Sequence, residues 1–417
     1  MGVLEGEITR KRQYKIRDGR LIFALETDTN IDDEILQQAL SQNADAKLKS
    51  IVTTIQREQN SIIRDTSHRI MVVQGCAGSG KTSVALHRIA YLLYHNRNAL
   101  KAAQILVLSP NSIFGDYISR ILPELGEENI CEMTLDDYAY RELRIYGEAQ
   151  DRYDVLERKL RGEDCSEADH KQNREYVKEL DLFILQQEWE NVEIDDISYN
   201  RSVMKADRIT KLFYEKFSDV PFLKRMDKIA DYFIDEQETI RNKDMEEEEK
   251  ELICEKFRAM YVCNDIFELY QQFLMDSGRD EELIAGRTIP YEHVYPLLYL
   301  KYSLEGVPKR RRVRHLLIDE MQDYSYIQYS VIRRLFDCSM TILGDRKQTM
   351  EENQSDVMRF LPEIFGRDIT FIRMDRSYRS TVEIMTYAES VLGGGSELNS
   401  VERHGETPGI LAACSEE

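Results

Sequence analysis

Gly75-Cys76-Ala77-Gly78-Ser79-Gly80-Lys81-Thr82 is the stretch that places the strongest constraint on how this chain folds. It follows the pattern G-x-x-x-x-G-K-[ST], whose glycines let the backbone turn tightly and direct several N–H groups at one anion. In such a loop the lysine brings a point charge to the β- and γ-phosphates of a nucleotide, and the final hydroxyl can bind Mg²⁺. We therefore predict a triphosphate-binding loop made by Gly75, Gly78, Ser79, Gly80, Lys81 and Thr82.

The residues on either side of this loop have the patterns of a strand and a helix. Residues 69–74 form a short apolar run of the kind found in buried parallel strands. Residues 83–94 carry apolar side chains at helical spacing. The loop is thus predicted to precede a helix N-terminus, where the helix dipole and free N–H groups favour phosphate. The fold class that follows is α/β with a parallel sheet.

Three later apolar stretches also end in polar residues, which in a parallel sheet face the ligand crevice. Residues 104–108 lead into Ser109, and residues 313–318 lead into Asp319 and Glu320. Asp319 is a candidate Mg²⁺ ligand, and Glu320 is a candidate base that polarises the attacking water. The strand at 340–343 leads to Gln348, a candidate sensor of the γ-phosphate. After a fourth strand at 368–372, the side chains with candidate roles are Tyr378, which can stack on a base, and Arg379, which can serve as an arginine finger.

Composition restricts the class of protein and its partners. The net charge is −20, and no apolar stretch reaches the roughly 18 residues of a membrane span, so we expect no membrane contact. Seven scattered cysteines without a C-x-x-C pair predict a reducing, cytoplasmic setting and no zinc site. Because non-specific nucleic-acid binders are usually basic, any DNA must meet a local basic track, or the main partner is another protein.

Residues 141–307 differ from the rest of the chain. Long helical patterns dominate there, and 25 Lys and Arg stand against 40 Asp and Glu, a net charge of −15. The acidic run 244–249 is interpreted as a solvated helix face, with a recognition surface as the alternative. The single tryptophan, Trp189, is predicted to pack in the core. The basic cluster 308–314 is a candidate phosphate contact or a solvated strand entrance.

These pieces, in this order, resemble superfamily 1 helicases of the UvrD/Rep type. Asp319-Glu320-Met321-Gln322-Asp323 and Gly344–Gln348 carry the D-E-x-Q-D and G-D-x-x-Q forms that are specific to this group. Residues 51–64, 74–94, 108–127 and 316–329 look most like the HelD subfamily of RNA-polymerase-associated motor ATPases. The resemblance covers residues 1–140 and 313–405 well and the intervening stretch poorly.

The resemblance implies a RecA-like lobe that uses ATP and Mg²⁺ to move along DNA, single-stranded or duplex, in the 3′-to-5′ direction. The residues it implicates in catalysis are Lys81, Glu320, Gln348 and Arg379. It further implies adenine contacts from Gln59 and Tyr378, Mg²⁺ ligands from Thr82 and Asp319, and DNA contacts from Ser109, Pro110 and Asn111. The expected domains are a first RecA-like lobe at 1–140 and 308–373, an acidic helical insertion at 141–307, and the start of a second lobe at 374–417.

Two departures from the family pattern qualify the expected activity. Residues 349–355 lack the aromatic side chains that stack single-stranded bases in UvrD-type enzymes, and they carry two carboxylates instead. Nothing after Arg379 resembles the later motifs of the second lobe, so we expect a shortened chain that binds ATP and hydrolyses it weakly. One hypothesis is therefore a helicase motor lobe with a HelD-like role at RNA polymerase, which the acidic insertion would contact. The other is a nucleotide-gated interaction module that binds RNA polymerase without unwinding DNA.

Overall fold

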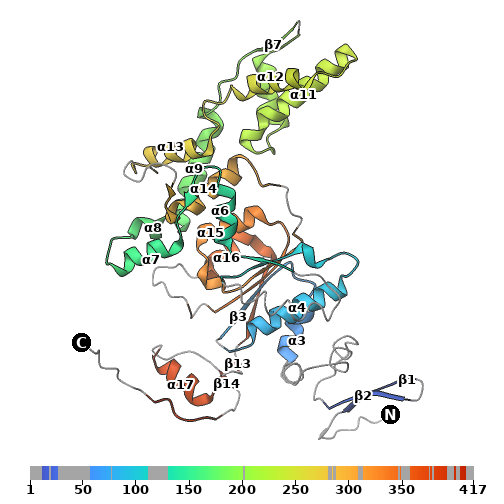
Figure 1. Ribbon diagram of the computed structural model, residues 1–417, viewed down its shortest axis with the longest axis vertical. Coiled ribbons are helices and arrows are strands. Elements are labelled where there is room, and N and C mark those ends of the chain that lie inside the picture. The colour runs from blue at the N-terminus through green and yellow to red at the C-terminus, as the bar shows by residue number, and fades with distance from the viewer. Residues whose placement is uncertain are drawn as a thin grey trace. The chain divides into compact units, whose positions relative to one another are not determined.

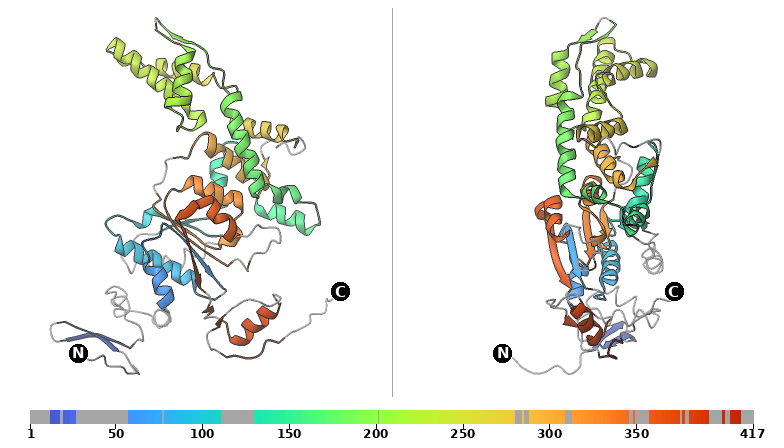
Figure 2. Two further views of the ribbon diagram at one scale, coloured as in Figure 1. Left: turned by 180° about the vertical axis from the view of Figure 1, so that it is seen from behind. Right: turned by 90° about the vertical axis from the view of Figure 1, so that its left-hand side faces the viewer.

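The computed structural model describes most of the chain in two compact units (Figures 1 and 2). The first unit comprises Met1–Ala103, Ile113–Cys131 and Thr370–Glu417, and the second comprises Gln104–Ser112 and Glu132–Ile369. The residues described are 12–17, 20–26, 57–76, 78–110, 130–200, 202–279, 284, 288–308, 313–345, 348, 357–374, 376–377, 380–391, 399–400 and 404–409.

The α/β class predicted from the sequence is confirmed by a six-stranded sheet, consistent with a RecA-like fold. Its strand order is β12-β3-β11-β10-β4-β5. β10 pairs in parallel with β4 and with β11, so that Ile318 lies opposite Leu108 and Ile342. The apolar runs read as strands are strands, and the bounds of the six are β3 (Ile70–Gly75), β4 (Ile105–Leu108), β5 (Cys131–Met133), β10 (His315–Ile318), β11 (Ser339–Gly344) and β12 (Ile369–Met374).

The first unit places the predicted loop between a buried strand and a helix. β3 is buried along nearly its whole length, and α4 (Lys81–His95) follows it and buries its apolar face. Residues 12–17 and 20–26 pair as antiparallel strands, and residues 18–19 between them lie outside the described residues. The remaining elements are β1 (Arg12–Arg17), β2 (Arg20–Glu26), α3 (Arg57–Arg64), β13 (Arg376–Ser377), α17 (Val382–Val391) and β14 (Asn399–Ser400).

The second unit is mainly helical between β5 and β10, as the sequence predicted. The helices of this stretch are α6 (Leu135–Leu143), α7 (Arg152–Leu160), α8 (Ser166–His170), α9 (Arg174–Glu190), α10 (Ala206–Lys211), the π-helical turn η3 (Leu212–Lys216), η4 (Phe222–Lys224), α11 (Arg225–Arg241), α12 (Glu247–Arg258), α13 (Ile266–Asp276) and α14 (Tyr291–Leu304). Short strand pairs join β6 (Glu148–Ala149) to β9 (Thr288–Ile289) and β7 (Ile197–Tyr199) to β8 (Ser202–Met204).

Helix α14 lies at the centre of this helical stretch. It packs against α6, α9 and α13, and also against α15 (Tyr326–Leu335), which follows β10. Nearly all of its side chains are buried, including the polar Glu292 and His293. α16 (Val357–Phe365) packs against α15 in turn. The helical stretch therefore shares one compact unit with β4, β10 and β11, and the domain boundaries at 141 and 307 stay predictions.

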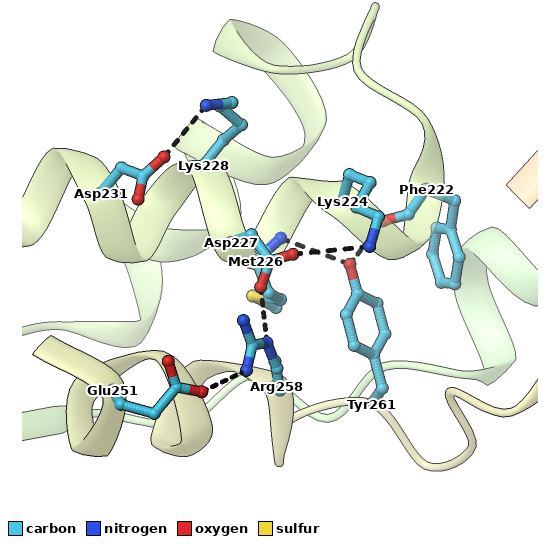
Figure 3. A network of polar contacts seen from close by, with 9 residues as sticks. All are labelled: Phe222, Lys224, Met226, Asp227, Lys228, Asp231, Glu251, Arg258 and Tyr261. Atoms are coloured by element: carbon cyan, nitrogen blue, oxygen red, sulfur yellow. Dashed lines mark hydrogen bonds and ion pairs between the residues drawn. The ribbon is translucent and has the colours of Figure 1, made fainter. Parts of the chain in front are cut away.

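A polar network fastens α11 to α12 and to η4 (Figure 3). The Arg258 guanidinium donates to Asp227 at 2.7 Å and to Glu251 at 2.7 Å. The buried Tyr261 hydroxyl donates to the Phe222 carbonyl and accepts from the Met226 N–H at 3.3 Å. Because the arginine is partly exposed and the tyrosine is buried, the hydroxyl is the more consequential of the two connections.

The prediction for Trp189 is wrong, because this side chain is 72% exposed. Helical periodicity identifies an apolar position, but it cannot tell whether a neighbouring element covers it. The acidic run fits the solvated interpretation better, since Glu247 and Glu248 are exposed and Glu249 is half-buried in the first turn of α12, where carboxylates interact favourably with the helix dipole. In the part of the chain that the structure describes, no helix is both long and apolar enough to cross a membrane.

Candidate nucleotide site

The loop from Gly75 to Thr82 has the backbone that its glycines predicted. Gly78 and Gly80 have φ angles of 74° and 83°, in the left-handed region that side chains disfavour. At Gly75 a Cβ atom would lie 2.5 Å from the Ser79 Oγ. All three glycines are therefore required by the shape of this turn, and Gly80 caps the N-terminus of α4.

Two polar groups of the loop suit an anionic ligand. The Lys81 Nζ donates to the carbonyls of Gly75 at 3.0 Å and Cys76 at 3.3 Å, and these are neutral partners for a full charge. Ser79 is fully buried, and its Oγ has no hydrogen-bond partner among the described residues. A buried hydroxyl without a partner costs free energy, about 1–3 kcal/mol, which a bound phosphate oxygen would relieve. The loop thus fits a phosphate group on the evidence of its own side chains.

Gln59, the candidate adenine contact, lies against this loop. Its side chain is buried at the start of the first unit's α3, and its Nε2 donates to the Ser79 carbonyl at 3.1 Å. Arg88 ties the same two helices together by donating to the Ile62 carbonyl at 2.5 Å. Burial lowers the pKa of Arg88 to about 10, although the charge of Asp65 opposes the change. The helix carrying Gln59 is therefore held firmly on the helix that follows the loop.

Asp319 and Glu320 lie at the end of β10 in the second unit. Asp319 is buried, its N–H donates to the Leu108 carbonyl at 3.0 Å, and its Oδ1 accepts from the Glu320 N–H at 3.0 Å. Glu320 has a φ angle of 51°, which is uncommon for a residue with a side chain. A strained backbone of this kind costs free energy and persists only where the surrounding structure holds it in place. Such positions cluster at functional sites.

A chain of hydrogen bonds joins Glu320 to Gln348 through two residues to which the sequence analysis gave no role. The Gln322 Nε2 donates to the Glu320 Oε2 at 2.7 Å, and its Oε1 accepts from the Asp345 N–H at 3.0 Å. The Gln348 Nε2 donates to the Asp345 Oδ2 at 3.1 Å. In the sequence, Gln322 served only as part of the D-E-x-Q-D pattern. Its position two residues after Glu320, as an amide among carboxylates, was the signal that could have indicated its role.

Helix α15 holds the segment that follows Glu320 in place. Ser325 begins that helix with a reciprocal cap to Gln328, and the buried Tyr329 hydroxyl donates to the Met321 carbonyl at 3.1 Å. Burial raises the pKa of Tyr329 well above its ordinary value, so it stays a neutral donor. Gly344 faces the same segment closely, since a Cβ there would lie 2.5 Å from the Gln322 Oε1.

The candidate residues fall into two described groups and a third that lies outside the description. Gln59, Ser79 and Lys81 are brought together in the first unit, with Thr82 exposed in the first turn of α4. Asp319, Glu320 and Gln348 are brought together in the second unit. Ser109 is buried just after β4 beside Pro110. The positions outside the described residues are Asn111, Tyr378, Arg379, 309–312 and 349–355.

The known proteins to which this chain is similar are helicases. The model of the UvrD/REP helicase N-terminal domain matches residues 55–350. The chain is 21% identical over 365 residues to the ATP-dependent DNA helicase UvrD1 of Mycobacterium leprae, covering 84% of this chain and 40% of the relative. It is 24% identical over 354 residues to the ATP-dependent DNA helicase srs2 of Schizosaccharomyces pombe, covering 82% and 35%. A probable DNA helicase II homolog of Rickettsia conorii is 29% identical over 152 residues, covering 35% and 21%. The matched part of the chain spans less than half the length of each relative.

Proposed function

Since the chain belongs to the UvrD/REP helicase N-terminal domain family, we propose that it is the ATP-binding motor lobe of an ATP-dependent DNA helicase or translocase. The observation that carries this proposal is the loop from Gly75 to Thr82. There the buried Ser79 hydroxyl has no hydrogen-bond partner among the described residues and Lys81 donates to neutral carbonyls, and both groups suit a triphosphate. The relatives' names support ATP and DNA as the ligands.

In this proposal the loop holds the phosphates and two oxygen ligands hold Mg²⁺. Lys81 exchanges its bonds to the Gly75 and Cys76 carbonyls for β- and γ-phosphate oxygens. Thr82 and Asp319 are the proposed Mg²⁺ ligands, since hydroxyl and carboxylate oxygens suit this ion. The bound ion would neutralise charge on the phosphates. Gln59 and Tyr378 are the proposed adenine contacts.

Glu320 is the proposed general base for hydrolysis. It takes a proton from the attacking water as the water oxygen bonds to the γ-phosphorus and the bond to the ADP oxygen breaks. Gln322 orients this carboxylate through the 2.7 Å hydrogen bond to Oε2. Gln348 is the proposed γ-phosphate sensor, and its link through Asp345 and Gln322 gives it a route to the base.

Arg379 is the proposed finger that stabilises charge on the γ-phosphate. It is supported by the Cys76 N–H of the loop, which donates to the Met374 carbonyl at 3.4 Å, because Arg379 follows Met374 by five positions in the sequence. Ser109, Pro110 and Asn111 are the proposed DNA contacts. The 3′-to-5′ direction belongs to the same proposal.

Nucleotide binding and hydrolysis test the motor function directly. We expect the chain to bind MgATP, the Lys81→Ala variant to lose at least tenfold in affinity, and the Glu320→Gln variant to keep its affinity while hydrolysis falls about a hundredfold or more. Equilibrium binding of a fluorescent ATP analogue and a phosphate-release assay measure the two quantities. Hydrolysis unchanged in Glu320→Gln would contradict the assignment of the base.

A second candidate is a HelD-like role, in which the lobe remodels complexes of RNA polymerase with nucleic acid, or binds the polymerase in a nucleotide-gated way without unwinding. The net charge of −15 in residues 141–307 favours it, because an acidic surface suits basic protein and repels DNA. Capture of purified RNA polymerase at moderate salt tests it, and ATP-dependent strand separation would argue against the pure interaction module.

A further inference from the structure

Helix α9 presents a stripe of apolar side chains to solvent. Leu182, Leu185 and Trp189 are 65%, 58% and 72% exposed, and their i, i+3, i+7 spacing puts them on one side of the helix. Single exposed apolar residues are normal on protein surfaces, whereas an ordered row of large ones marks an interaction site. None of these three residues belongs to the candidate nucleotide site.

Trp189 is held in place rather than loose at the surface. Its ring stacks on Tyr214 at a centroid distance of 5.2 Å and an interplanar angle of 14°. The Tyr214 hydroxyl donates to the Glu188 carbonyl at 2.8 Å, one residue before the tryptophan. Tyr214 lies in the π-helical turn η3, and such turns occur frequently at functional sites. A ring fixed before binding loses little entropy when a partner covers it.

A further exposed apolar side chain lies near the end of the helix. Val262 is 63% exposed, and its N–H donates to the carbonyl of Asn191, the residue that caps α9, at 3.3 Å.

The exposed charges at the tryptophan end of the stripe are acidic, whereas Lys178 is exposed one turn before Leu182 at the other end. Residues 179–200 contain seven Asp and Glu, of which Glu179, Asp181, Glu188 and Asp196 form ion pairs with Arg279, Arg334, Arg225 and Lys205. Glu190, Glu193 and Asp195 are exposed near the tryptophan end of the helix. An apolar centre with an acidic rim complements a protein surface whose apolar centre has a basic rim. The same carboxylates repel a phosphate backbone, so the tryptophan is poorly placed to stack on nucleic-acid bases.

We propose that Leu182, Leu185 and Trp189 form a docking face for a protein partner that presents an apolar helix flanked by Lys and Arg. This docking face gives the protein-interaction function proposed above a specific location, one side of helix α9. The choice of a protein as the partner rests on that proposed function. Docking is independent of ATP use, because the docking face and the nucleotide-binding residues share no side chain.

The single tryptophan of the chain makes the test direct, because all indole emission comes from Trp189. The full chain is titrated with a synthetic amphipathic helix that has Leu on one face and Lys at the rim. We expect a saturable blue shift and at least a twofold loss of acrylamide quenching. Leu182→Ser and Leu185→Ser, which keep the reporter, should each weaken binding about tenfold. The matched control is Ile240→Ser on α11, which is 68% exposed and off the stripe, and it should bind normally.

Four results would overturn the proposal. They are an equal response to the same peptide with Glu in place of Lys, a response to oligothymidylate, a shift that grows with the concentration of the chain alone, and no response to any probe. ATP hydrolysis should be unchanged in both Leu variants. Polymerase capture is scored separately, so failure of the docking face and failure of the interaction function give different results.

Discussion

At Gly344 the addition of a single methyl group should lower both stability and the rate of hydrolysis. A Cβ added there would lie 2.5 Å from the Gln322 Oε1 and 2.7 Å from the Met321 backbone nitrogen, which cannot move aside easily. We expect Gly344→Ala to lower the free energy of unfolding by about 1–3 kcal/mol and to slow hydrolysis, because it displaces the residue that orients Glu320. Urea unfolding and steady-state ATPase rates measure the two effects. Gly409→Ala, where a Cβ meets no atom within 4 Å, should change neither.

Gln322 should act on the rate of hydrolysis and leave nucleotide affinity nearly unchanged. Gln322→Leu keeps the approximate size of the side chain but removes the donor to Glu320 and the acceptor for Asp345. We expect kcat to fall about ten- to a hundredfold, with nucleotide Kd changed less than about twofold, because the contact orients the base and does not touch the nucleotide in the proposed site.

The chain offers a matched control for this substitution. Gln271 likewise uses its amide both as a donor and as an acceptor, in its case with the carbonyl and the N–H of Ile284, at 2.9 and 3.1 Å. Gln271→Leu should lower stability by a similar amount and leave kcat intact. If both variants lost kcat equally, the effect of Gln322 would be one of general stability and the positioning role would be wrong.

The role of Gln322 shows what the sequence could and could not predict at this scale. The residues next to the loop could be predicted, because a short contiguous pattern fixes their geometry. Gln322 contacts Asp345, which is 23 positions away, and only the packing of β10 beside β11 brings the two together. The roles of Tyr378 and Arg379 stay predictions, because both residues lie outside the described part of the chain.

At the scale of elements, the network between α11, α12 and η4 separates two kinds of polar contact. Tyr261→Phe removes a buried hydroxyl and with it the acceptor of the Met226 N–H, while the Phe222 carbonyl keeps only the Arg225 N–H, so we expect a loss of about 1–3 kcal/mol. Arg258→Met removes two partly exposed ion pairs and should cost about 1 kcal/mol or less. Thermal unfolding of both variants measures the difference, and a larger loss in Arg258→Met would contradict this ranking.

Helix α14 should contribute a pH dependence to stability through His293. Burial lowers the pKa of His293 to about 3, with the charges of Lys171 and Arg158 adding to the effect, so the folded chain keeps the ring neutral. The unfolded chain takes up a proton near pH 6.5, so stability is full above that pH and falls as the pH drops toward 3. We expect a loss of about 2 kcal/mol at pH 5 relative to pH 7.5 from this residue alone.

Urea unfolding at the two pH values measures this contribution. His293→Gln should remove about 2 kcal/mol of the pH dependence, while the amide can still accept from the Tyr270 hydroxyl, which lies 2.9 Å from the ring. An identical pH dependence in the chain and in His293→Gln would show that the ring is not kept neutral.

The order of strands and helices could be predicted because burial on both faces leaves continuous apolar runs, as in β4 and β10. Which apolar side chains of α9 are exposed could not be predicted, because Phe183 and Trp189 are both apolar in the sequence. Phe183 is buried against Phe273 of α13, whereas Trp189 stacks on Tyr214 and is 72% exposed. Which side of a helix is covered depends on partners that no local pattern specifies.

At the scale of the whole molecule, nucleotide should stabilise the fold by mass action. A ligand that binds only the folded chain adds about 2.7 kcal/mol at a hundred times its Kd. We expect a non-hydrolysable MgATP analogue to raise the unfolding temperature of the chain, and Lys81→Ala to abolish the rise. An equal rise in Lys81→Ala would show that the nucleotide binds elsewhere.

The pairing of β4 with β10 affects how the protein folds during its synthesis. Ile105 lies opposite His315, so two neighbouring strands are separated by 210 positions of sequence. At about 5–20 residues per second, a ribosome needs roughly 10–40 s to make the second strand after the first. During that interval the apolar strand β4 cannot pair with β10, because β10 has not yet been made. The intervening helices are rich in local contacts and have time to form. The helical stretch should therefore mature first on the ribosome and shorten the gap that the sheet must close.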